Sequence, residues 1–178
     1  MRIVIVDYGM GNIRSIVSTL KHLGVDDVLL GSDFETLSSS DKIILPGVGS
    51  FGKAITKIRQ KNIDKYLNRI VLENKKPLLG ICLGMQLLGS SSTEDGYNEG
   101  LDYINGHVIK LDNSFVKVPH VGFNQVKVNN KLKLYYGFKN ELTDFYFTHS
   151  FRMKSDSDIN QCYCNYKDDF VASFEQDN

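Results

Sequence analysis

The sequence predicts an α/β fold: a doubly wound, mainly parallel sheet with helices on both faces and an antiparallel, β-rich second half. Before about residue 100, short apolar runs alternate with amphipathic helical patterns, which is typical of a parallel sheet covered on both faces. After that point, short strand-like runs follow one another between turn residues. At 178 residues, the whole chain fits a single domain.

Apolar periodicity predicts the elements of the first half. Residues 2–7 form an apolar strand, and residues 12–23 place apolar side chains on one face of a helix that ends at Gly24. Residues 53–74 carry a second, longer helical pattern. Further apolar runs predict strands at residues 28–30, 42–45 and 77–82.

The second half is predicted to be made of strands. Turn residues at 129–130 and 167–169 separate some of the runs. The sequence contains no internal repeat and no linker, so both halves are expected to belong to one domain. The strand-like runs, which we expect to pair at the margin of the sheet, are residues 106–111, 124–128, 144–152, 161–166 and 170–175.

Charge and composition exclude several classes of protein. Lys and Arg number 21, Asp and Glu also number 21, and neither sign forms a long block, so no surface for nucleic acid or an anionic membrane is expected. Asp7 interrupts the apolar run at residues 3–6, which is far too short for a signal peptide or a membrane span. We therefore expect a cytoplasmic protein whose partners are small molecules or other proteins.

The three cysteines are expected to be thiols. Their odd number and the lack of secretory context argue against a disulfide framework. Cys162 and Cys164 share one face of a predicted strand and lack a second pair of ligands, so no metal site is predicted. Residues 7–12 (DYGMGN) lack the third glycine of a dinucleotide-binding loop, so we reject a nucleotide site and expect no cofactor.

Cys82 stands in the sequence pattern of a catalytic nucleophile. Residues 80–84 read GICLG, between an apolar strand and a helical pattern. The glycines permit a tight strand-to-helix turn that projects Cys82 outward, and a helix N-terminus favours a thiolate. A buried structural cysteine is the alternative, and the short pattern alone leaves the two interpretations about equal.

A second glycine motif ends the preceding predicted strand. Residues 46–51 read PGVGSF. Two glycines let the backbone turn its N–H groups toward a neighbouring strand end, where they can receive an anion. Taken in isolation, an ordinary glycine turn explains the motif better.

The wider sequence resembles the class I, or triad, glutamine amidotransferases. The resemblance rests on residues 77–86 (PLLGICLGMQ) and on the motif at residues 46–51. Residues 7–12, 118–124 (VPHVGFN) and 145–151 (FYFTHSF) resemble one branch of that family, the glutaminase subunits of imidazole glycerol phosphate synthase. The resemblance extends from residue 2 to about residue 174. It implies hydrolysis of glutamine to glutamate and ammonia, with the ammonia passed to a synthase (cyclase) partner in histidine biosynthesis.

The resemblance also implies roles for individual residues. Cys82 would attack the side-chain amide of glutamine, while backbone N–H groups of Val48, Gly49 and Leu83 hold the oxyanion. Without the resemblance, some of these residues have ordinary explanations, as a surface helix residue, a loop carboxylate or strand-end histidines. The implied glutamine-binding residues are Gly47, Gln86, Glu94, His149, Ser150 and Phe151. The implied partner-facing residues are Pro119, His120, Phe123 and Asn124.

Two departures from the family pattern keep alternatives open. Phe123 stands where the branch has tryptophan, so the client could be another synthase, for instance a sugar amidotransferase in surface-glycan synthesis. No His-Pro-Glu motif follows the predicted strand at residues 170–175, so we expect a C-terminally truncated domain in which Cys82 lacks its histidine and glutamate. A catalytically inactive, partner-binding subunit is a second alternative. A cysteine hydrolase or peptidase is a third, which the branch motifs disfavour.

Overall fold

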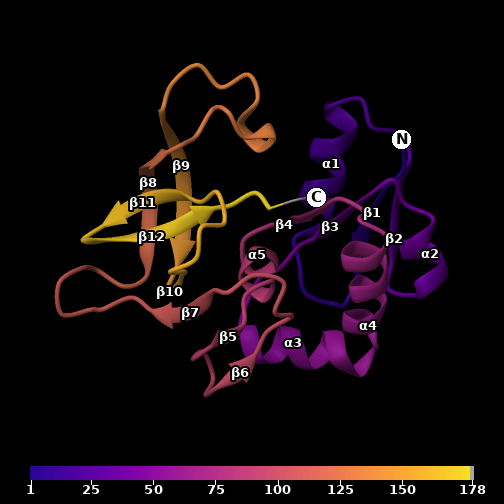
Figure 1. The fold of residues 1–178 in the computed structure, drawn as a ribbon, viewed down its shortest axis with the longest axis horizontal. Helices are drawn as coiled ribbons and strands as arrows, with labels where there is room; N and C mark the ends of the chain where they lie inside the picture. The colour runs from indigo at the N-terminus through magenta and orange to yellow at the C-terminus, as the bar shows by residue number, and fades with distance from the viewer. Residues whose placement is uncertain (177–178) are drawn as a thin grey trace.

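The computed structural model describes residues 1–176 and contains two sheets, with the helices gathered around the first (Figure 1). The first sheet has the strand order β2-β1-β3-β4, and all of its pairings are parallel. The carboxyl ends of its strands therefore meet at one edge. Its strands are β1 (Ile3–Val6), β2 (Val28–Gly31), β3 (Lys42–Leu45) and β4 (Leu78–Gly80).

Helices pack on both faces of the parallel sheet, which confirms the predicted fold class. Successive strand residues point to opposite faces. Ile3 and Ile5 therefore pack with α1 (Ile13–His22) on one face, while Val4 and Val6 pack on the other. That second face is covered by α2 (Phe34–Ser38), α3 (Phe51–Gln60) and α4 (Ile63–Leu67).

The predicted single helix over residues 53–74 is wrong. Helix α3 ends at Gln60, and Asn62 adopts a left-handed conformation (φ +55°) before α4 begins. Asparagine tolerates that conformation better than most residues, so it breaks the helix without glycine. Helix α4 then runs into a π-helical segment, Asn68–Glu73.

Helix α2 was not predicted from the apolar pattern. Its N-cap, Asp33, accepts a hydrogen bond from the backbone N–H of Thr36 at 2.8 Å. The aspartate cap was the available signal, but the helix has only five residues and one buried side chain, Leu37. Such a short helix shows too little periodicity to be recognised.

The strands of the second half form their own eight-stranded sheet, in the order β6-β5-β7-β10-β12-β11-β8-β9, rather than extending the parallel one. All pairings are antiparallel except β5 with β7. Ser150 divides the predicted strand at residues 144–152 into two. The strands are β5 (Ser91–Ser92), β6 (Asn98–Glu99), β7 (His107–Lys110), β8 (His120–Lys127), β9 (Leu142–His149), β10 (Phe151–Lys154), β11 (Cys162–Tyr166) and β12 (Asp168–Ser173).

One apolar core connects the two sheets. Val108, Met153 and Val171 of the second sheet pack in the same buried cluster as the helices of the first. A second cluster around Val126 and Phe170 fills the far side of the antiparallel sheet. A short 3-10 helix, Lys133–Tyr135, lies over that cluster. Within residues 1–176, none of the helices combines the length and apolarity needed to cross a bilayer.

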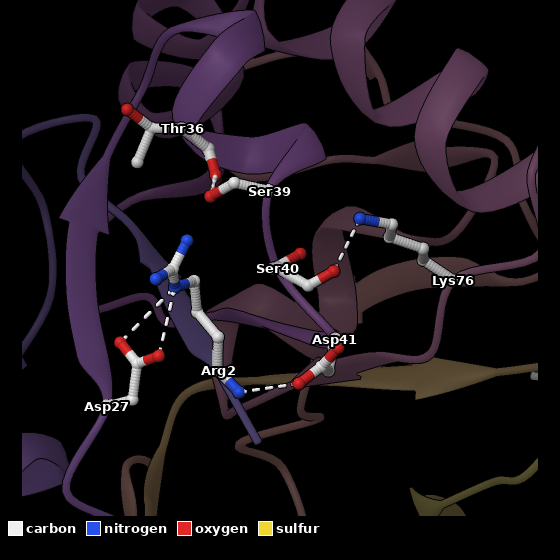
Figure 2. Close-up of polar contacts among 7 residues, drawn as sticks. All are labelled: Arg2, Asp27, Thr36, Ser39, Ser40, Asp41 and Lys76. Carbon is white, nitrogen blue, oxygen red and sulfur yellow. Dashed lines mark hydrogen bonds and ion pairs between the residues drawn. The ribbon is translucent and has the colours of Figure 1, made fainter.

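Polar contacts hold the amino-terminal edge of the parallel sheet (Figure 2). Arg2 donates through its backbone N–H to Asp41 at 2.6 Å and pairs through its guanidinium with Asp27 at 3.1 Å. Lys76, just before β4, donates to the backbone carbonyls of Ser38 and Ser40. These contacts connect the starts of the strands.

Candidate active site

Cys82 lies at the sharp turn between β4 and α5 (Leu83–Leu87). Its backbone has φ +56° and ψ −117°, a conformation that non-glycine residues rarely adopt and that costs on the order of 1–3 kcal/mol. The side chain reaches solvent. The structure thus has the strand-to-helix turn that the sequence predicts, with the thiol exposed at its tip.

Close backbone contacts explain the two glycines of the turn. A Cβ on Gly84 would lie 1.8 Å from the carbonyl oxygen of Leu45, and a Cβ on Gly80 would lie 2.7 Å from Cα of Met85. The same Leu45 carbonyl accepts a hydrogen bond from the N–H of Ile81 at 3.0 Å. The turn therefore packs against the carboxyl end of β3.

The glycine loop at residues 46–49 lies against the first turn of α5, as the sequence predicts. A Cβ on Gly47 would lie 2.7 Å from the amide nitrogen of Gly84. Gly49 has φ +91°, which a side chain would strain. Among the described residues, no acceptor takes a hydrogen bond from the N–H groups of Val48 and Gly49. Both groups are thus without an intramolecular acceptor within residues 1–176.

The environment of Cys82 favours the thiol over the thiolate. Although the side chain reaches solvent, enough protein surrounds the sulfur for burial to raise its pKa, and the N–H of Leu83 lowers the pKa by less. Formation of the thiolate is therefore disfavoured by these surroundings, and a general base would promote it. Within residues 1–176, no histidine is hydrogen-bonded to Cys82.

Glu94 lies where the glycine loop joins α3. Its Oε2 accepts a hydrogen bond from the backbone N–H of Phe51 at 2.8 Å. Burial raises the pKa of this carboxyl, and the bond from Phe51 partly offsets the rise. The structure therefore brings Glu94 to the loop that the sequence assigns to the oxyanion, although 43 residues separate Glu94 from Phe51.

Gln86 connects α5 to the junction between β9 and β10. Its Nε2 donates to the carbonyl of Phe151 at 3.1 Å. The same carbonyl accepts a hydrogen bond from His149 Nδ1 at 2.8 Å. The carbonyl of Ser150, between them, accepts from the N–H of Leu111 at 2.9 Å. The predicted glutamine-binding residues of this junction are thus brought next to Gln86, on the helix that follows Cys82.

His120 is buried, which does not fit the predicted contact with a partner. Its side chain is 4% exposed and stacks on Tyr166 with ring centroids 3.8 Å apart. Its Nδ1 lies 3.0 Å from Nε2 of His149. Burial lowers the pKa of both histidines.

The rest of the predicted partner-facing segment lies at or near the surface. Phe123 is 77% exposed and packs edge-on against Tyr146 of β9, with centroids 5.3 Å apart. Pro119 is exposed, and Asn124 is partly exposed and donates to the carbonyl of Asn165 at 3.0 Å. Sequence reasoning missed Tyr146, although register pairs it directly with Phe123.

The other two cysteines take no part in the site. Cys162 and Cys164 are buried free thiols of β11. Among residues 1–176, no group of three or more histidine, cysteine or acidic side chains is arranged to hold a metal ion.

A cysteine on a strand-to-helix turn, beside a loop with two free N–H groups, is the arrangement of an enzyme that transfers an acyl group through a covalent intermediate. Residues 4–178 match the family Glutamine amidotransferase class-I. The chain belongs to this family.

Several curated relatives of the chain are subunits of one synthase. The chain is 40% identical to imidazole glycerol phosphate synthase subunit HisH of Aquifex aeolicus (strain VF5), over 100% of this chain and 85% of the relative. It is 41% identical to the HisH subunit of Methanosarcina barkeri, over 97% of this chain and 83% of the relative. A crystal structure of a glutamine amidotransferase shares the fold, with a TM-score of 0.73 at 18% identity, over 97% of this chain and 84% of that one.

Proposed function

We propose that this protein is the glutaminase subunit of imidazole glycerol phosphate synthase. It hydrolyses glutamine to glutamate and ammonia, and the ammonia passes to a cyclase partner in histidine biosynthesis. The observation that carries the proposal is the exposed thiol of Cys82 at a strained turn, beside the unpaired N–H groups of Val48 and Gly49. The identity to HisH subunits over the whole chain supports the choice of client.

The mechanism is acyl transfer through a thioester. Cys82 attacks the side-chain amide carbon of glutamine, and the resulting oxyanion accepts hydrogen bonds from Val48, Gly49 and Leu83. The C–N bond breaks as the nitrogen leaves with a proton as ammonia, which leaves a glutamyl thioester on Cys82. Water then adds to the thioester and releases glutamate and the thiol. Glu94, Gln86 and the junction at His149–Phe151 would hold the ammonium, carboxylate and amide groups of the substrate.

Two steps of this mechanism need a proton carrier. The thiol of Cys82 must lose its proton, and the leaving nitrogen must gain one. The family resemblance assigns this role to the histidine of a His-Pro-Glu motif, which does not occur in residues 1–178. We therefore expect a polypeptide of residues 1–178 by itself to turn over glutamine roughly 10²–10⁴-fold more slowly than a protein that carries the motif.

The exposed aromatic side chain of Phe123 supports a second candidate, in which the same glutaminase serves a different client. Tryptophan is the branch residue at this position, and the surface around it would contact the partner. A sugar amidotransferase in surface-glycan synthesis is the client of this alternative. The chemistry at Cys82 is the same in both cases.

The experiment measures ammonia release from glutamine by the full-length protein, with and without a histidine-pathway cyclase. We expect strong stimulation by the cyclase, because uncoupled hydrolysis would waste glutamine. Equal rates with and without it would contradict the proposed client, and the absence of hydrolysis in both would favour an inactive, partner-binding subunit.

Replacing Phe123 by tryptophan refines the test of the client. Phe123→Trp should tighten binding to the histidine-pathway cyclase if that is the client. Tyr136→Trp is the matched control, since Tyr136 is 90% exposed in the segment before β9, outside the Phe123–Tyr146 contact, and should leave binding unchanged. Weaker binding by the Phe123 variant alone would favour a different synthase.

A further inference from the structure

The segment at residues 7–12 has no role in the proposed chemistry, yet it contacts the glycine loop at residues 46–49. Tyr8 follows β1 and is 1% exposed. Its hydroxyl donates a hydrogen bond to the carbonyl of Pro46 at 2.8 Å. A Cβ on Gly11 would lie 3.1 Å from the ring of Pro46. The tyrosine therefore contacts the first residue of the loop.

The bond to Pro46 satisfies a buried acceptor. Pro46 is itself buried and has no N–H of its own. Tyr8 is the one donor that the described structure gives to this carbonyl. A buried carbonyl without a donor is unfavourable, so loss of the hydroxyl would let the peptide unit after Pro46 move.

That peptide unit begins the stretch whose N–H groups the proposed function assigns to the oxyanion. Gly47 and Gly49 make the stretch conformationally permissive, so its geometry depends on anchors outside it. Two anchors are present, one at each end: Tyr8 holds Pro46, and Glu94 holds the N–H of Phe51 at 2.8 Å. Between them, the N–H groups of Val48 and Gly49 carry no intramolecular bond among the described residues.

Tyr8 is itself held in place. Lys57 and Lys61 of the α3 region donate to the carbonyls of Gly9 and Asp7, both at 3.3 Å. The N–H of Gly9 donates to the Asp7 carboxylate at 3.0 Å. Burial, and then the nearby charge of Cys82 when ionised, raise the pKa of Tyr8, so its hydroxyl keeps its proton and stays a donor.

We propose that Tyr8 is a positioning residue for glutamine hydrolysis, which fixes the Pro46 carbonyl and thereby aims the N–H groups of Val48 and Gly49 at the oxyanion. The inference rests on the proposed function of Cys82. Tyr8 touches no reacting atom; it acts through the loop.

The test compares Tyr8→Phe with Tyr103→Phe in the full-length protein bound to its cyclase. Both substitutions delete one tyrosine hydroxyl that donates a hydrogen bond; Tyr8 is buried and Tyr103 is partly buried, and Tyr103 donates to Asn68 Oδ1 at 2.9 Å, away from the loop. We expect Tyr8→Phe to lower kcat roughly tenfold with little change in KM, a smaller loss than the 10²–10³-fold seen when an oxyanion donor is removed outright. Tyr103→Phe should leave both kcat and KM unchanged. Equal kcat values for the two variants would overturn the proposal.

A second readout isolates the oxyanion site from the reactivity of the thiol. A glutamine-mimicking chloroketone places its carbonyl in the oxyanion site, whereas iodoacetamide alkylates the thiol without using that site. Tyr8→Phe should slow the chloroketone severalfold and leave the iodoacetamide rate unchanged. Equal slowing of both reagents would contradict a role through the loop.

Two further outcomes are informative. If Tyr8→Phe unfolds, replacement by 3-fluorotyrosine retains the donor and should preserve both fold and kcat; loss of kcat in that folded variant would contradict the proposal. If the wild-type complex makes no ammonia and the chloroketone spares Cys82, the proposed function fails and this inference fails with it. If the wild type is active but the two phenylalanine variants are equal, only the role of Tyr8 fails.

Discussion

His120 Nδ1 and His149 Nε2 lie 3.0 Å apart and form the middle of a hydrogen-bonded chain that ends on the carbonyl holding Gln86. The carbonyl of Phe151 can only accept, so His149 Nδ1, at 2.8 Å, carries a proton. The neutral His149 ring then accepts at Nε2 from His120 Nδ1. His120 Nε2 is left as the acceptor for the amide of Asn124, at 3.5 Å. With both rings neutral, these contacts select one tautomer for each.

This pair should make the protein less stable in mild acid. Burial, and for His120 also the charge of His149, lowers both pKa values below the ordinary 6.5. Below about pH 6.5 the unfolded chain therefore binds more protons than the folded one, so the free energy of unfolding falls as the pH falls. Urea unfolding between pH 7.5 and pH 5 measures the slope, which should be smaller in a His120→Gln, His149→Gln double variant. His22→Gln, an exposed residue of α1, is the control; an equal slope in the double variant and the control would contradict the account.

Glu94 should contribute to substrate binding more than to stability. Glu94→Gln keeps an oxygen that can accept from Phe51 but removes the charge that would pair with the ammonium of glutamine. A hydrogen bond to a charged group is worth roughly 1.5–3 kcal/mol, so KM should rise by about tenfold or more. The free energy of unfolding should change by less than about 1 kcal/mol. Glu99→Gln, on neighbouring β6, is the control; an unchanged KM in the Glu94 variant would limit Glu94 to holding the start of α3.

Gly84 should tolerate no side chain. In Gly84→Ala the new Cβ would meet the Leu45 carbonyl at 1.8 Å, so the turn or β3 must shift. We expect a loss of about 3 kcal/mol or more in unfolding free energy, at the upper end for overpacking, together with loss of activity. Gly24→Ala separates this clash from backbone strain, because Gly24 has φ +78° and open space around it. It should cost only about 1–2 kcal/mol; equal losses in thermal or urea unfolding would contradict the steric explanation.

Local pattern was enough to predict the strands of the parallel sheet, but not α2 or the break between α3 and α4. Residues 43–45, which follow Lys42, are an unbroken apolar run. The structure has β3 (Lys42–Leu45) at that position. The turn at Cys82 was also predicted from a local glycine spacing. Gly80 meets Met85 within a few residues, whereas the contact of Gly84 with Leu45 of β3 joins residues far apart in the chain.

Features that depend on contacts between distant residues could not be predicted. Separation of the strands into a second sheet depends on pairings such as Cys164 with Val126. The buried histidine pair depends on the register that sets His120 opposite His149, 29 residues away. The left-handed Asn62, which breaks the predicted long helix, lies in a stretch whose apolar spacing continues on both sides. Apolar periodicity indicates which side chains are buried, but it does not indicate which distant residues they pack against.

The most direct test of the central claim, that Cys82 is the nucleophile of a glutaminase, is to locate the site of covalent labelling. The full-length protein is treated with a glutamine-mimicking chloroketone, digested and analysed by mass spectrometry. We predict modification of Cys82, slowed by added glutamine and abolished in Cys82→Ser, with the buried Cys162 and Cys164 unmodified. Labelling that persists in Cys82→Ser, or that falls on Cys162 or Cys164 while Cys82 stays free, would contradict the account.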